Sequence, residues 1–503
     1  MYNNVIDYLI SSAEAYPNKI AYEDAHKSIT FQELKEISQS IASRIIDTFG
    51  KIKNQPIAVY MKKSVDMLCA FMGIVYSGNF YSPIDVKSPQ SRAENIISTL
   101  EPIALIAKKD KIPQFNGNYV LISFEDALEE KCHDNLEEHR RKVLDTDPLY
   151  VLFTSGSTGK PKGVTISHRG VIDYTEWLYD TFHFDSNTVF GNQAPFYFDN
   201  SILDIYSTLR NGSTMEIIPE HLFTFPVKVL EFINEKKINT LFWVPSALIG
   251  VANAQALDKI HLEYIQKVLF CGEVMPNKQL NEWRKHYPDL LYANLYGPTE
   301  ITDVCAYYIV NRTFRDDEPL PIGKACENME ILVLNDKNEL VVGDESGELC
   351  VRGCGVSMGY YRNEEKTSSA FVQNPLNSCY RDTIYRTGDI VKYNEYGELI
   401  YLSRKDFQIK HQGHRIELGE IEVAATSIDG VDQSCAMYDE KNKRIVLFYV
   451  AGNEVTEKMI YQELKLKVPA YMLPTLIKHV DEFPLNLNGK IDRISLKREF
   501  FEE

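Results

Sequence analysis

The sequence lacks a long hydrophobic run. Its longest apolar segment, Met67 to Tyr76 followed by Ser77 and Gly78, is about half of the roughly 20 residues that a membrane-spanning helix requires. We therefore interpret it as a buried helix. The first residues, up to Asp7, contain no basic side chain and include an acidic one where a signal peptide is apolar. They therefore do not predict secretion.

Cysteine pairs and basic side chains are also scarce. None of the nine cysteines forms a C-x-x-C pair, and Cys350 and Cys354 are the closest two, which indicates reduced thiols and a cytoplasmic protein. The 54 lysines and arginines are outnumbered by 71 aspartates and glutamates, giving a formal charge of −17. Binding to a nucleic-acid backbone or an anionic membrane requires clustered basic residues. Both are disfavoured, although a local basic loop could still hold a small anion.

What the sequence does contain is a long globular chain of 503 residues, 44% of them hydrophobic, which is enough for several domains. Strand-like segments alternate with amphipathic helical ones over the first four hundred residues. A strand from Pro56 to Tyr60 precedes a helix from Ser64 to Ser77, and a helix from Glu231 to Lys237 precedes a strand from Thr240 to Val244. This alternation predicts an α/β architecture.

The pattern changes near Arg404 to Asp406, where short strands and turns precede a charged helix expected from Arg415 to Ser427. We predict an N-terminal domain, residues 1–403, and a small C-terminal α/β domain, residues 404–503, with its own core. The connection between them is short and is expected to be a hinge.

The most informative segment is a loop rich in glycine and hydroxyl groups that follows a β-rich run from Tyr150. Glycines let backbone N–H groups approach an anion, and hydroxyls and lysines add donors and charge, so the loop predicts a phosphate site. A Walker A loop would need Gly at Thr154 and Ser or Thr at Pro161, which disfavours a P-loop NTPase. Taken alone, the segment could also be a mobile surface loop. Its candidate residues are Thr154, Ser155, Gly156, Ser157, Thr158, Gly159, Lys160 and Lys162.

Three further segments carry chemistry that fits a nucleotide. The segment N-L-Y-G-P-T-E combines Tyr296 with Glu300, which suit base stacking and a divalent cation. The segment Y-R-T-G-D sets Asp389 on a tight turn, where it could accept from sugar hydroxyls, and N-G-K-I-D-R presents Lys490. Each segment alone could be an ordinary turn or carry a solvated side chain. Only the three segments together indicate a nucleotide site.

These motifs, together with F-D-N-S at 198–201 and R-I-E-L-G-E-I-E at 415–422, resemble the adenylate-forming superfamily. Within it the chain is similar to the amino-acid-activating adenylation domains of nonribosomal peptide synthetases and to D-alanine:carrier-protein ligases. The resemblance extends from about Tyr8 to Arg493. It implies a large N-terminal domain of sheets and helices and a small mobile C-terminal lid domain. It also implies an ATP-dependent, AMP-forming ligase that loads an amino acid onto the phosphopantetheine thiol of a carrier protein.

The resemblance also implies roles for single residues. Lys490 would bridge the substrate carboxylate and the α-phosphate, and Glu300 would bind Mg²⁺. Asp406 matches the hinge position, about which family enzymes rotate the small domain to bring residues 404–413 to the site for thioester formation. The implied ATP-binding set comprises the loop residues from Thr154 to Lys160, Lys162, Gly272, Glu273, Asn294, Tyr296 on adenine, Gly297, Thr299, Asp389 on the ribose and Arg404.

Asp199 is expected to pair with the α-ammonium of an amino acid, a feature that fatty-acid activators generally lack. The alternative is a capping aspartate before Ser201. Trp243 and the neighbouring leucines imply a small substrate side chain, such as D- or L-alanine, while Asp303 leaves serine or a diamino acid open. Cys271 is either a stereochemical selector or a small core residue. The implied pocket is Asp199, Asn200, Leu203, Trp243, Leu269, Cys271, Leu295, Asp303 and Val304.

No carrier segment with a G-G-x-S type serine is found after Arg493, so we expect a free-standing enzyme with a separate carrier protein. One alternative is an acyl- or aryl-CoA synthetase of the same superfamily, against which Asp199 argues. Another is a catalytically degenerate nucleotide-binding module, against which the intact Glu300, Asp389 and Lys490 argue. A nucleic-acid partner is not expected.

Overall fold

The computed structural model describes residues 2–133, 135–156, 160–405, 408–452, 454–484 and 491–501, with the side chain of residue 494 excepted. Over these residues no helix is both long and apolar enough to cross a bilayer. The apolar run forms α3 (Val65–Tyr76), which is buried at nearly every position and is capped by the Ser64 side chain. The expected buried helix is therefore confirmed. None of the nine cysteines forms a disulfide with another.

A six-stranded sheet holds the first part of the chain. Its strand order is β6-β5-β3-β4-β7-β8, and all neighbours are parallel except β7 and β8. The strand predicted at 56–60 is confirmed as β3. The strands are β3 (Pro56–Tyr60), β4 (Phe80–Ile84), β5 (Ala104–Ala107), β6 (Val120–Ser123), β7 (Pro148–Thr154) and β8 (Lys162–Ser167).

A nine-stranded sheet follows, in the order β15-β14-β13-β12-β11-β9-β10-β1-β2. The strands from β13 to β1 along this order are parallel, so the carboxyl ends of β11, β12 and β13 meet at one edge. The strands are β1 (Ile20–Glu23), β2 (Ser28–Thr30), β9 (Val189–Asn192), β10 (Thr214–Ile217), β11 (Thr240–Trp243), β12 (Lys267–Cys271), β13 (Leu291–Tyr296), β14 (Ala306–Ile309) and β15 (Lys324–Ala325).

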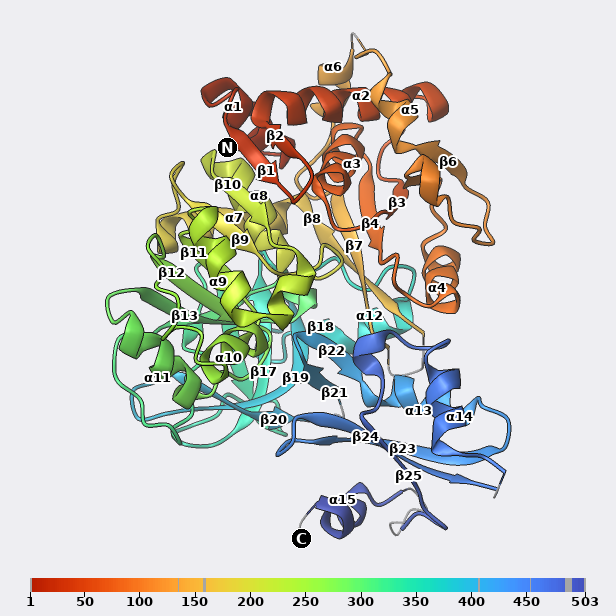
Figure 1. Ribbon diagram of the computed structural model, residues 1–503, viewed down its shortest axis with the longest axis vertical. Helices are drawn as coiled ribbons and strands as arrows, with labels where there is room; N and C mark the ends of the chain where they lie inside the picture. Colours follow the sequence, from red (N-terminus) through yellow and green to blue (C-terminus); the bar gives the residue numbers. More distant parts are fainter. Residues whose placement is uncertain are drawn as a thin grey trace.

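Helices cover both faces of each large sheet (Figure 1). One hydrophobic cluster contains strands of both sheets together with α1 (Ile6–Ala15), α2 (Phe31–Phe49), α3, α7 (His168–Phe182) and α8 (Ser201–Asn211). The outer face of the nine-stranded sheet packs against α9 (Pro226–Glu235), α10 (Pro245–Asn253) and α11 (Asn277–His286), and that of the six-stranded sheet against α4 (Gln90–Leu100). Two short helices, α5 (Phe124–Leu128) and α6 (Leu136–Arg140), precede β7. This layering is the α/β architecture predicted from the sequence.

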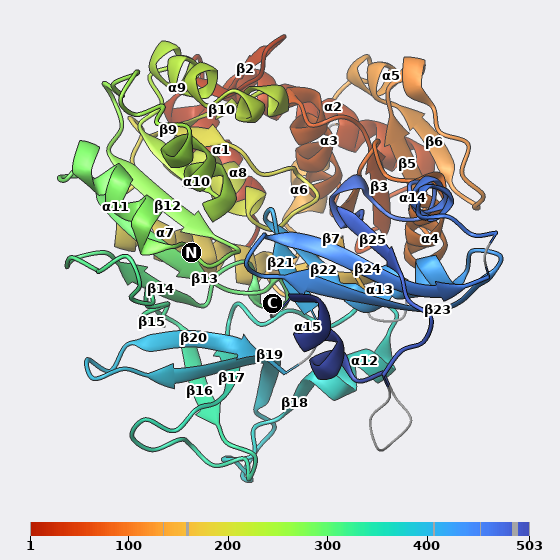
Figure 2. The ribbon, with the colours of Figure 1, turned by 60° about the horizontal axis from the view of Figure 1, so that its bottom comes forward.

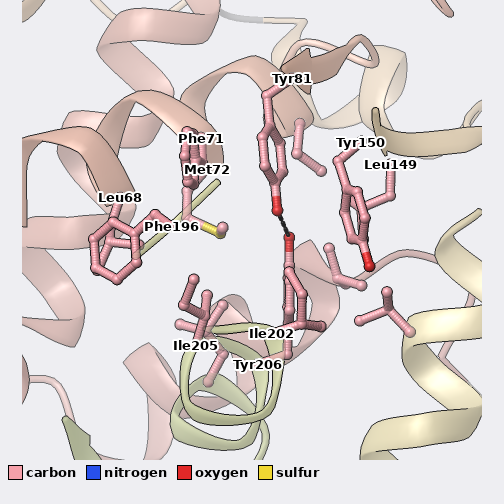
Figure 3. Close-up of a cluster of buried hydrophobic side chains, with 14 of the residues drawn as sticks. Leu68, Phe71, Met72, Tyr81, Leu149, Tyr150, Phe196, Ile202, Ile205 and Tyr206 are labelled. Carbon is pink, nitrogen blue, oxygen red and sulfur yellow. Dashed lines mark hydrogen bonds between the residues drawn. The ribbon is translucent and has the colours of Figure 1, made fainter. Parts of the chain in front are cut away.

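Figure 3 shows the shared cluster between the sheets. The hydroxyls of Tyr81 on β4 and Tyr206 on α8 are 3.0 Å apart and form a hydrogen bond. Phe71 of α3 stacks on Tyr81, with 4.1 Å between the ring centroids. Polar and aromatic contacts therefore tie the six-stranded sheet to a helix that covers the nine-stranded one.

A third, antiparallel sheet follows in the order β16-β17-β19-β18, with β20 paired to β19. Its register sets Asp389 of β19 directly opposite Arg404 of β20. Its elements are β16 (Met329–Leu334), β17 (Gly347–Gly353), α12 (Glu364–Ala370), β18 (Phe371–Gln373), β19 (Thr383–Tyr393) and β20 (Leu399–Arg404). Single 3₁₀ turns lie at η1 (Lys109–Lys111), η2 (Glu220–Thr224), η3 (Thr299–Ile301) and η4 (Ala470–Met472).

The remaining elements form a unit that we call the C-terminal module, residues 408–501. Its three-stranded sheet carries one hydrophobic cluster under α13 and α14 and another under α15 on the opposite face. The predicted boundary at 403/404 falls at the end of β20 and stays a prediction, and the predicted hinge residue Asp406 lies outside the described residues. The elements are β21 (Gln408–His411), β22 (His414–Glu417), α13 (Leu418–Thr426), β23 (Val431–Asp439), β24 (Arg444–Ala451), α14 (Glu457–Leu464), β25 (Leu476–His479) and α15 (Arg493–Phe501).

Several predicted boundaries differ from the structure. The helix expected from Arg415 begins only at Leu418, because residues 415–417 belong to β22 and pair with β21. The turn of this hairpin uses Gln412 and Gly413 at φ 51° and 78°, the left-handed region typical of tight hairpins. The strand expected to reach Val244 ends one residue earlier. The helix expected from Glu231 to Lys237 is α9, which runs from Pro226 to Glu235.

Candidate active site

Four of the segments singled out in the sequence meet at one cavity of about 40 Å³. It lies where β7, β12 and β13 end, beside the β21–β22 hairpin of the C-terminal module. Figure 2 shows this hairpin near the end of β7. Ligands of open α/β sheets bind at this carboxyl edge. The lining residues are Phe153, Thr154, Ser155, Phe198, Asp199, Asn200, Gly272, Gly297, Pro298, Thr299, Lys410, Gly413, Arg415 and Tyr471.

The start of the glycine-rich loop is bonded to the C-terminal module. Ser155 Oγ donates to the carbonyl oxygen of Arg415 (2.7 Å) and accepts from the Glu417 N–H (3.2 Å). The N–H of Gly156 donates to Glu420 Oε2 over 3.2 Å. A Cβ at Gly156 would stand only 2.0 Å from a backbone oxygen of the same loop. The loop therefore requires glycine here and offers its N–H to a carboxylate.

The other loop residues differ in their surroundings. Thr154 Oγ1 donates to the carbonyl oxygen of Lys162 over 3.5 Å, and Lys160 is exposed. The Lys162 ammonium is largely buried, and its Nζ lies 3.4 Å from Glu300 Oε1. Burial lowers the pKa of Lys162, and the nearby carboxylates oppose this effect. Three predicted phosphate-binding residues, Ser157, Thr158 and Gly159, lie outside the described residues.

Glu300 is fully buried on η3 and is surrounded by donors. Arg415 Nη1 lies 2.5 Å from Oε2, and Tyr360 donates its hydroxyl to Oε1 over 2.8 Å. Burial alone would raise the pKa of Glu300, but the charges of Arg415 and Lys162 and the Tyr360 hydrogen bond hold it well below its usual range. Glu300 is therefore a permanent anion whose partner in this arrangement is a guanidinium.

The predicted adenine and ribose residues also lie together. Tyr296 donates its hydroxyl to Asp389 Oδ2, and Arg404 Nη1 lies 2.6 Å from Asp389 Oδ1. The ammonium of Lys410 stands 5.4 Å from the centroid of the Tyr296 ring. Burial raises the pKa of Tyr296 and keeps the phenol neutral. The sequence motifs that carry these residues therefore converge on one corner of the site.

Two further residues predicted to bind the nucleotide form side-chain hydrogen bonds with backbone groups outside the cavity. Glu273 Oε2 accepts from the N–H of Ser246 (2.9 Å) in the first turn of α10. Asn294 is buried in β13, and its amide donates to the carbonyl oxygen of Pro321 (2.8 Å). Neither lines the cavity, so both side chains position the loops around it.

Asp199 faces the cavity from the loop before α8. Thr299 donates to its Oδ2 over 2.5 Å, and the N–H of Asn200 donates to its Oδ1 over 3.0 Å. Burial raises the pKa of Asp199, while Thr299 and the charge of Lys410 lower it. It forms no ion pair with any residue that the structure describes. The capping alternative is not supported, because no side-chain cap bond is formed at the start of α8.

The predicted side-chain pocket is divided between the two faces of the nine-stranded sheet. Leu203, Leu269, Cys271 and Leu295 are buried in the inner cluster behind the cavity. Trp243 is buried in the outer cluster, where its indole N–H donates to a backbone carbonyl and its ring packs edge to face on a phenylalanine. The structure therefore does not place Trp243 beside the other four.

Asp303 is buried behind the same cluster, at a backbone φ of 73°. Tyr174 donates its hydroxyl to Asp303 Oδ2 over 2.7 Å. Burial and the nearby charge of Asp199 raise the pKa of Asp303 well above its usual range. Val304 lines a separate, smaller cavity with Tyr174 and Trp177. In contrast to these two, Asn200 lines the main cavity, and its buried amide nitrogen has no hydrogen-bond partner.

Lys410, Gly413, Arg415 and Tyr471 line the cavity but were given no individual role from the sequence. All four belong to the C-terminal module. Two signals were available: the segment 404–413, which the resemblance brings to the site for thioester formation, and the 415–422 motif. Neither assigns a role to a single one of these side chains. The predicted catalytic residue Lys490 lies outside the described residues.

Comparisons with known proteins agree with this geometry. Residues 9–361 match the family model of the AMP-binding enzymes. A D-alanine--D-alanyl carrier protein ligase of Listeria innocua is 32% identical over 99% of both chains. The Vibrio cholerae adenylation domain AlmE, solved in complex with glycyl-adenosine-5'-phosphate, has the same fold, with a TM-score of 0.84 at 20% identity over 100% of this chain and 98% of that one. An adenylation and carrier-domain protein of nonribosomal peptide synthesis, PA1221, gives a TM-score of 0.85 at 22% identity over 99% of this chain and 84% of that one. The chain belongs to the family of AMP-binding enzymes.

Proposed function

We propose that this chain activates a small amino acid with ATP and transfers the aminoacyl group to the phosphopantetheine thiol of a separate carrier protein. The observation that carries the proposal is Asp199, a carboxylate on the cavity wall that forms no ion pair with the described residues. Such a group is stabilised by a cationic ligand, and the α-ammonium of an amino acid supplies one. The name of the Listeria innocua relative supports both the substrate class and the acceptor.

In the first half-reaction the amino-acid carboxylate attacks the α-phosphorus of ATP, and the bond to pyrophosphate breaks. Asp199 holds the ammonium group of the substrate. The amide nitrogen of Asn200, which has no hydrogen-bond partner, donates to the carboxylate group of the substrate. The loop from Thr154 to Lys162 holds the β- and γ-phosphates. Tyr296 stacks on adenine, and Asp389 with Arg404 holds the ribose side. Donors fixed before the reaction stabilise the developing charge without reorganisation.

Glu300 is the proposed ligand for Mg²⁺. A single carboxylate together with substrate phosphates is a usual donor set for this cation, and Glu300 is permanently ionised. When bound, magnesium offsets the negative charge of the triphosphate. Lys162 lies beside the same carboxylate and can share in that neutralisation.

Lys490 is the proposed catalytic lysine of the first half-reaction, carried by a domain of residues 404–503 that turns at Asp406. In the described arrangement the β21–β22 hairpin lies at the cavity. Phe483 and Leu496 pack on the face of the module's sheet opposite α13 and α14, where α15 also lies (Figure 1). This supports an orientation that serves the second half-reaction, in which the thiol sulfur attacks the carbonyl carbon and AMP leaves.

The proposed substrate is D- or L-alanine, because the residues behind Asp199 form a closely packed apolar cluster with little space. The proposed location is the cytoplasm, which is supported by nine cysteines that form no disulfide with one another. The test is ATP–pyrophosphate exchange over the L and D amino acids, glycine, 2,3-diaminopropionate and a set of fatty and aryl acids. The proposal predicts exchange with a small amino acid alone. Exchange with an aryl or fatty acid would instead identify a CoA synthetase. If no acid supports exchange, the chain is a catalytically degenerate module.

A further inference from the structure

A lysine next to the six-stranded sheet holds the base of the loop that carries Asp199. Lys63 lies between β3 and α3, and its ammonium donates to the carbonyl oxygens of Asn192 (3.3 Å) and Gln193 (3.0 Å) at the end of β9. The same ammonium stands 5.6 Å from the centroid of the Phe196 ring. Lys63 therefore contacts the first half of a loop that belongs to the other large sheet.

The far end of this loop is held by a buried aspartate. Asp204 lies in the first turn of α8, and its Oδ2 accepts from the side-chain amide of Asn192 over 2.8 Å. Both side chains are fully buried. Because Asn192 precedes the loop and α8 follows it, this hydrogen bond joins the two ends of the loop that carries Asp199.

The surroundings of this contact call for a positive charge. Asn192 Oδ1, Gln193 Oε1 and Asp204 Oδ1 are buried acceptors with no hydrogen-bond partner among the described residues. Such a group is costly unless a cation lies near it, and Lys63 supplies one. Burial lowers the pKa of Lys63 to about 7, whereas the charges of Glu220 and Asp204 act to raise it. Burial raises the pKa of Asp204 to about 7, whereas the Asn192 hydrogen bond and the charge of Lys63 act to lower it. Each charge therefore favours the other.

We propose that Lys63 and Asp204 are positioning residues for Asp199, and that they act as one charge pair which fixes the loop of residues 193–200 at both ends. The inference rests on the proposed function of Asp199 as the ligand of the substrate ammonium. Asp199 follows a strand of the nine-stranded sheet, whereas the glycine-rich loop follows β7 of the six-stranded sheet. Lys63 thus sets the ammonium ligand relative to the phosphate loop, where an error of about 1 Å can cost about 10²-fold in rate.

The test compares two non-hydrolysable adenylate analogues that differ only in the α-ammonium, alanyl sulfamoyl adenosine (D and L forms) and propionyl sulfamoyl adenosine. Calorimetry on the full chain gives the Kd of each. Lys63→Met keeps the length of the side chain and removes its charge. We expect this variant to bind the alanyl analogue about 10- to 30-fold more weakly than the wild type, and the propionyl analogue within about 3-fold. A general disturbance of the site would weaken both analogues equally, and that result, or unchanged binding of the alanyl analogue, overturns the proposal.

A double-mutant cycle tests whether the two charges act as one pair. Asp204→Asn keeps an acceptor for the Asn192 amide and removes the charge, so it should weaken the alanyl analogue about as much as Lys63→Met does. The double variant should lose no more than about 3-fold beyond either single variant, because both changes remove the same interaction. Lys63→Arg keeps the charge and should bind the alanyl analogue within about 3-fold of the wild type. Losses that multiply in the double variant contradict the pair.

Lys19→Met is the matched control. Lys19 also donates its ammonium to two backbone carbonyl oxygens, those of Ser186 before β9 and Gly212 after α8, at the other end of the same strand–helix unit. Its loss should leave the ratio of the two affinities unchanged, and a fall as large as that in Lys63→Met would mean that loosening of the unit is the cause. A wild type that binds both analogues equally overturns the proposed function of Asp199 as well. A wild-type preference that Lys63→Met retains overturns the positioning role alone, so the two failures are distinguishable.

Discussion

Lys410 and Asp199 line the same cavity, although one belongs to the hairpin of the C-terminal module and the other to the loop before α8. Burial raises the pKa of Asp199, and the ammonium of Lys410 acts against that rise. In this arrangement the positive charge of Lys410 acts on the carboxylate to which the ammonium of an amino acid is proposed to bind. The proposed substrate ammonium would be a second cation beside a carboxylate that already has a partial counter-charge.

Asp199→Ala should raise the KM for the amino acid about 10²- to 10³-fold, because removing one member of a buried charge pair costs about 3 to 5 kcal/mol. ATP–pyrophosphate exchange at varied amino-acid concentration measures it. Thr299→Val, which keeps the side-chain shape and removes the hydrogen bond to Asp199, is the graded comparison and should cost about 1 kcal/mol. An unchanged KM in Asp199→Ala would discard the assigned role.

Lys490→Ala should reduce pyrophosphate exchange at least 10²-fold, since the lysine is proposed to neutralise charge only during adenylation. The same variant should still pass a preformed aminoacyl-adenylate to phosphopantetheine thiol at a rate near that of the wild type. Lys497→Ala, at a partly exposed lysine of α15 whose Nζ lies 3.8 Å from Glu440, serves as the control. Full exchange activity in Lys490→Ala contradicts the assignment.

Gly413→Ala should slow thiol transfer 10-fold or more while leaving exchange within about 3-fold. The residue has φ 78°, and an added Cβ would stand 2.5 Å from Val244 Cγ1, so the hairpin could not seat against the cavity. Gly397→Ala carries the same kind of backbone strain, at φ 73°, but has nothing within 4 Å. If both variants lose thiol transfer equally, backbone strain and not seating is the cause.

His168 should make the fold sensitive to acid. It is buried, and its Nδ1 accepts from the N–H of Val5 (3.3 Å); burial lowers its pKa to about 4. Between pH 6.5 and about 4 the unfolded chain binds this proton and the folded chain does not, so stability falls as pH decreases through that window. His168→Asn should remove about 2 kcal/mol of the stability difference between pH 7 and pH 5.

Urea unfolding at the two pH values measures that difference. His26→Asn, at an exposed position, is the control and should leave the pH dependence as in the wild type. A His168→Asn variant with the same pH dependence as the wild type would show that this imidazole is not the acid-sensitive group.

The sequence indicated which N-terminal segments meet at the cavity, because these motifs follow strands. Ser155, Asp199 and Thr299 lie on loops that a parallel α/β layout brings to one edge, and their residue types indicate the chemistry. Lys410 and Arg415 could not be placed in this way. Their position depends on how a separately packed module docks, and no local pattern encodes that orientation.

Trp243 shows a different limit. The run Leu241-Phe242-Trp243 is buried throughout, so hydrophobic alternation does not reveal which face each residue takes. In the structure Phe242 points to the inner cluster and Trp243 to the outer one. The bulk of Trp243 therefore does not support a small substrate pocket. That inference depends instead on how the residues of the inner cluster pack.

The single cluster that joins the two large sheets, with its bond between Tyr81 and Tyr206, has a consequence for how the chain melts. Elements that share one core lose it together, so both sheets should denature in one calorimetric transition. The C-terminal module, which keeps clusters of its own, can then come apart at a different temperature. Heat would then unfold the C-terminal module and the larger N-terminal part in two separate transitions.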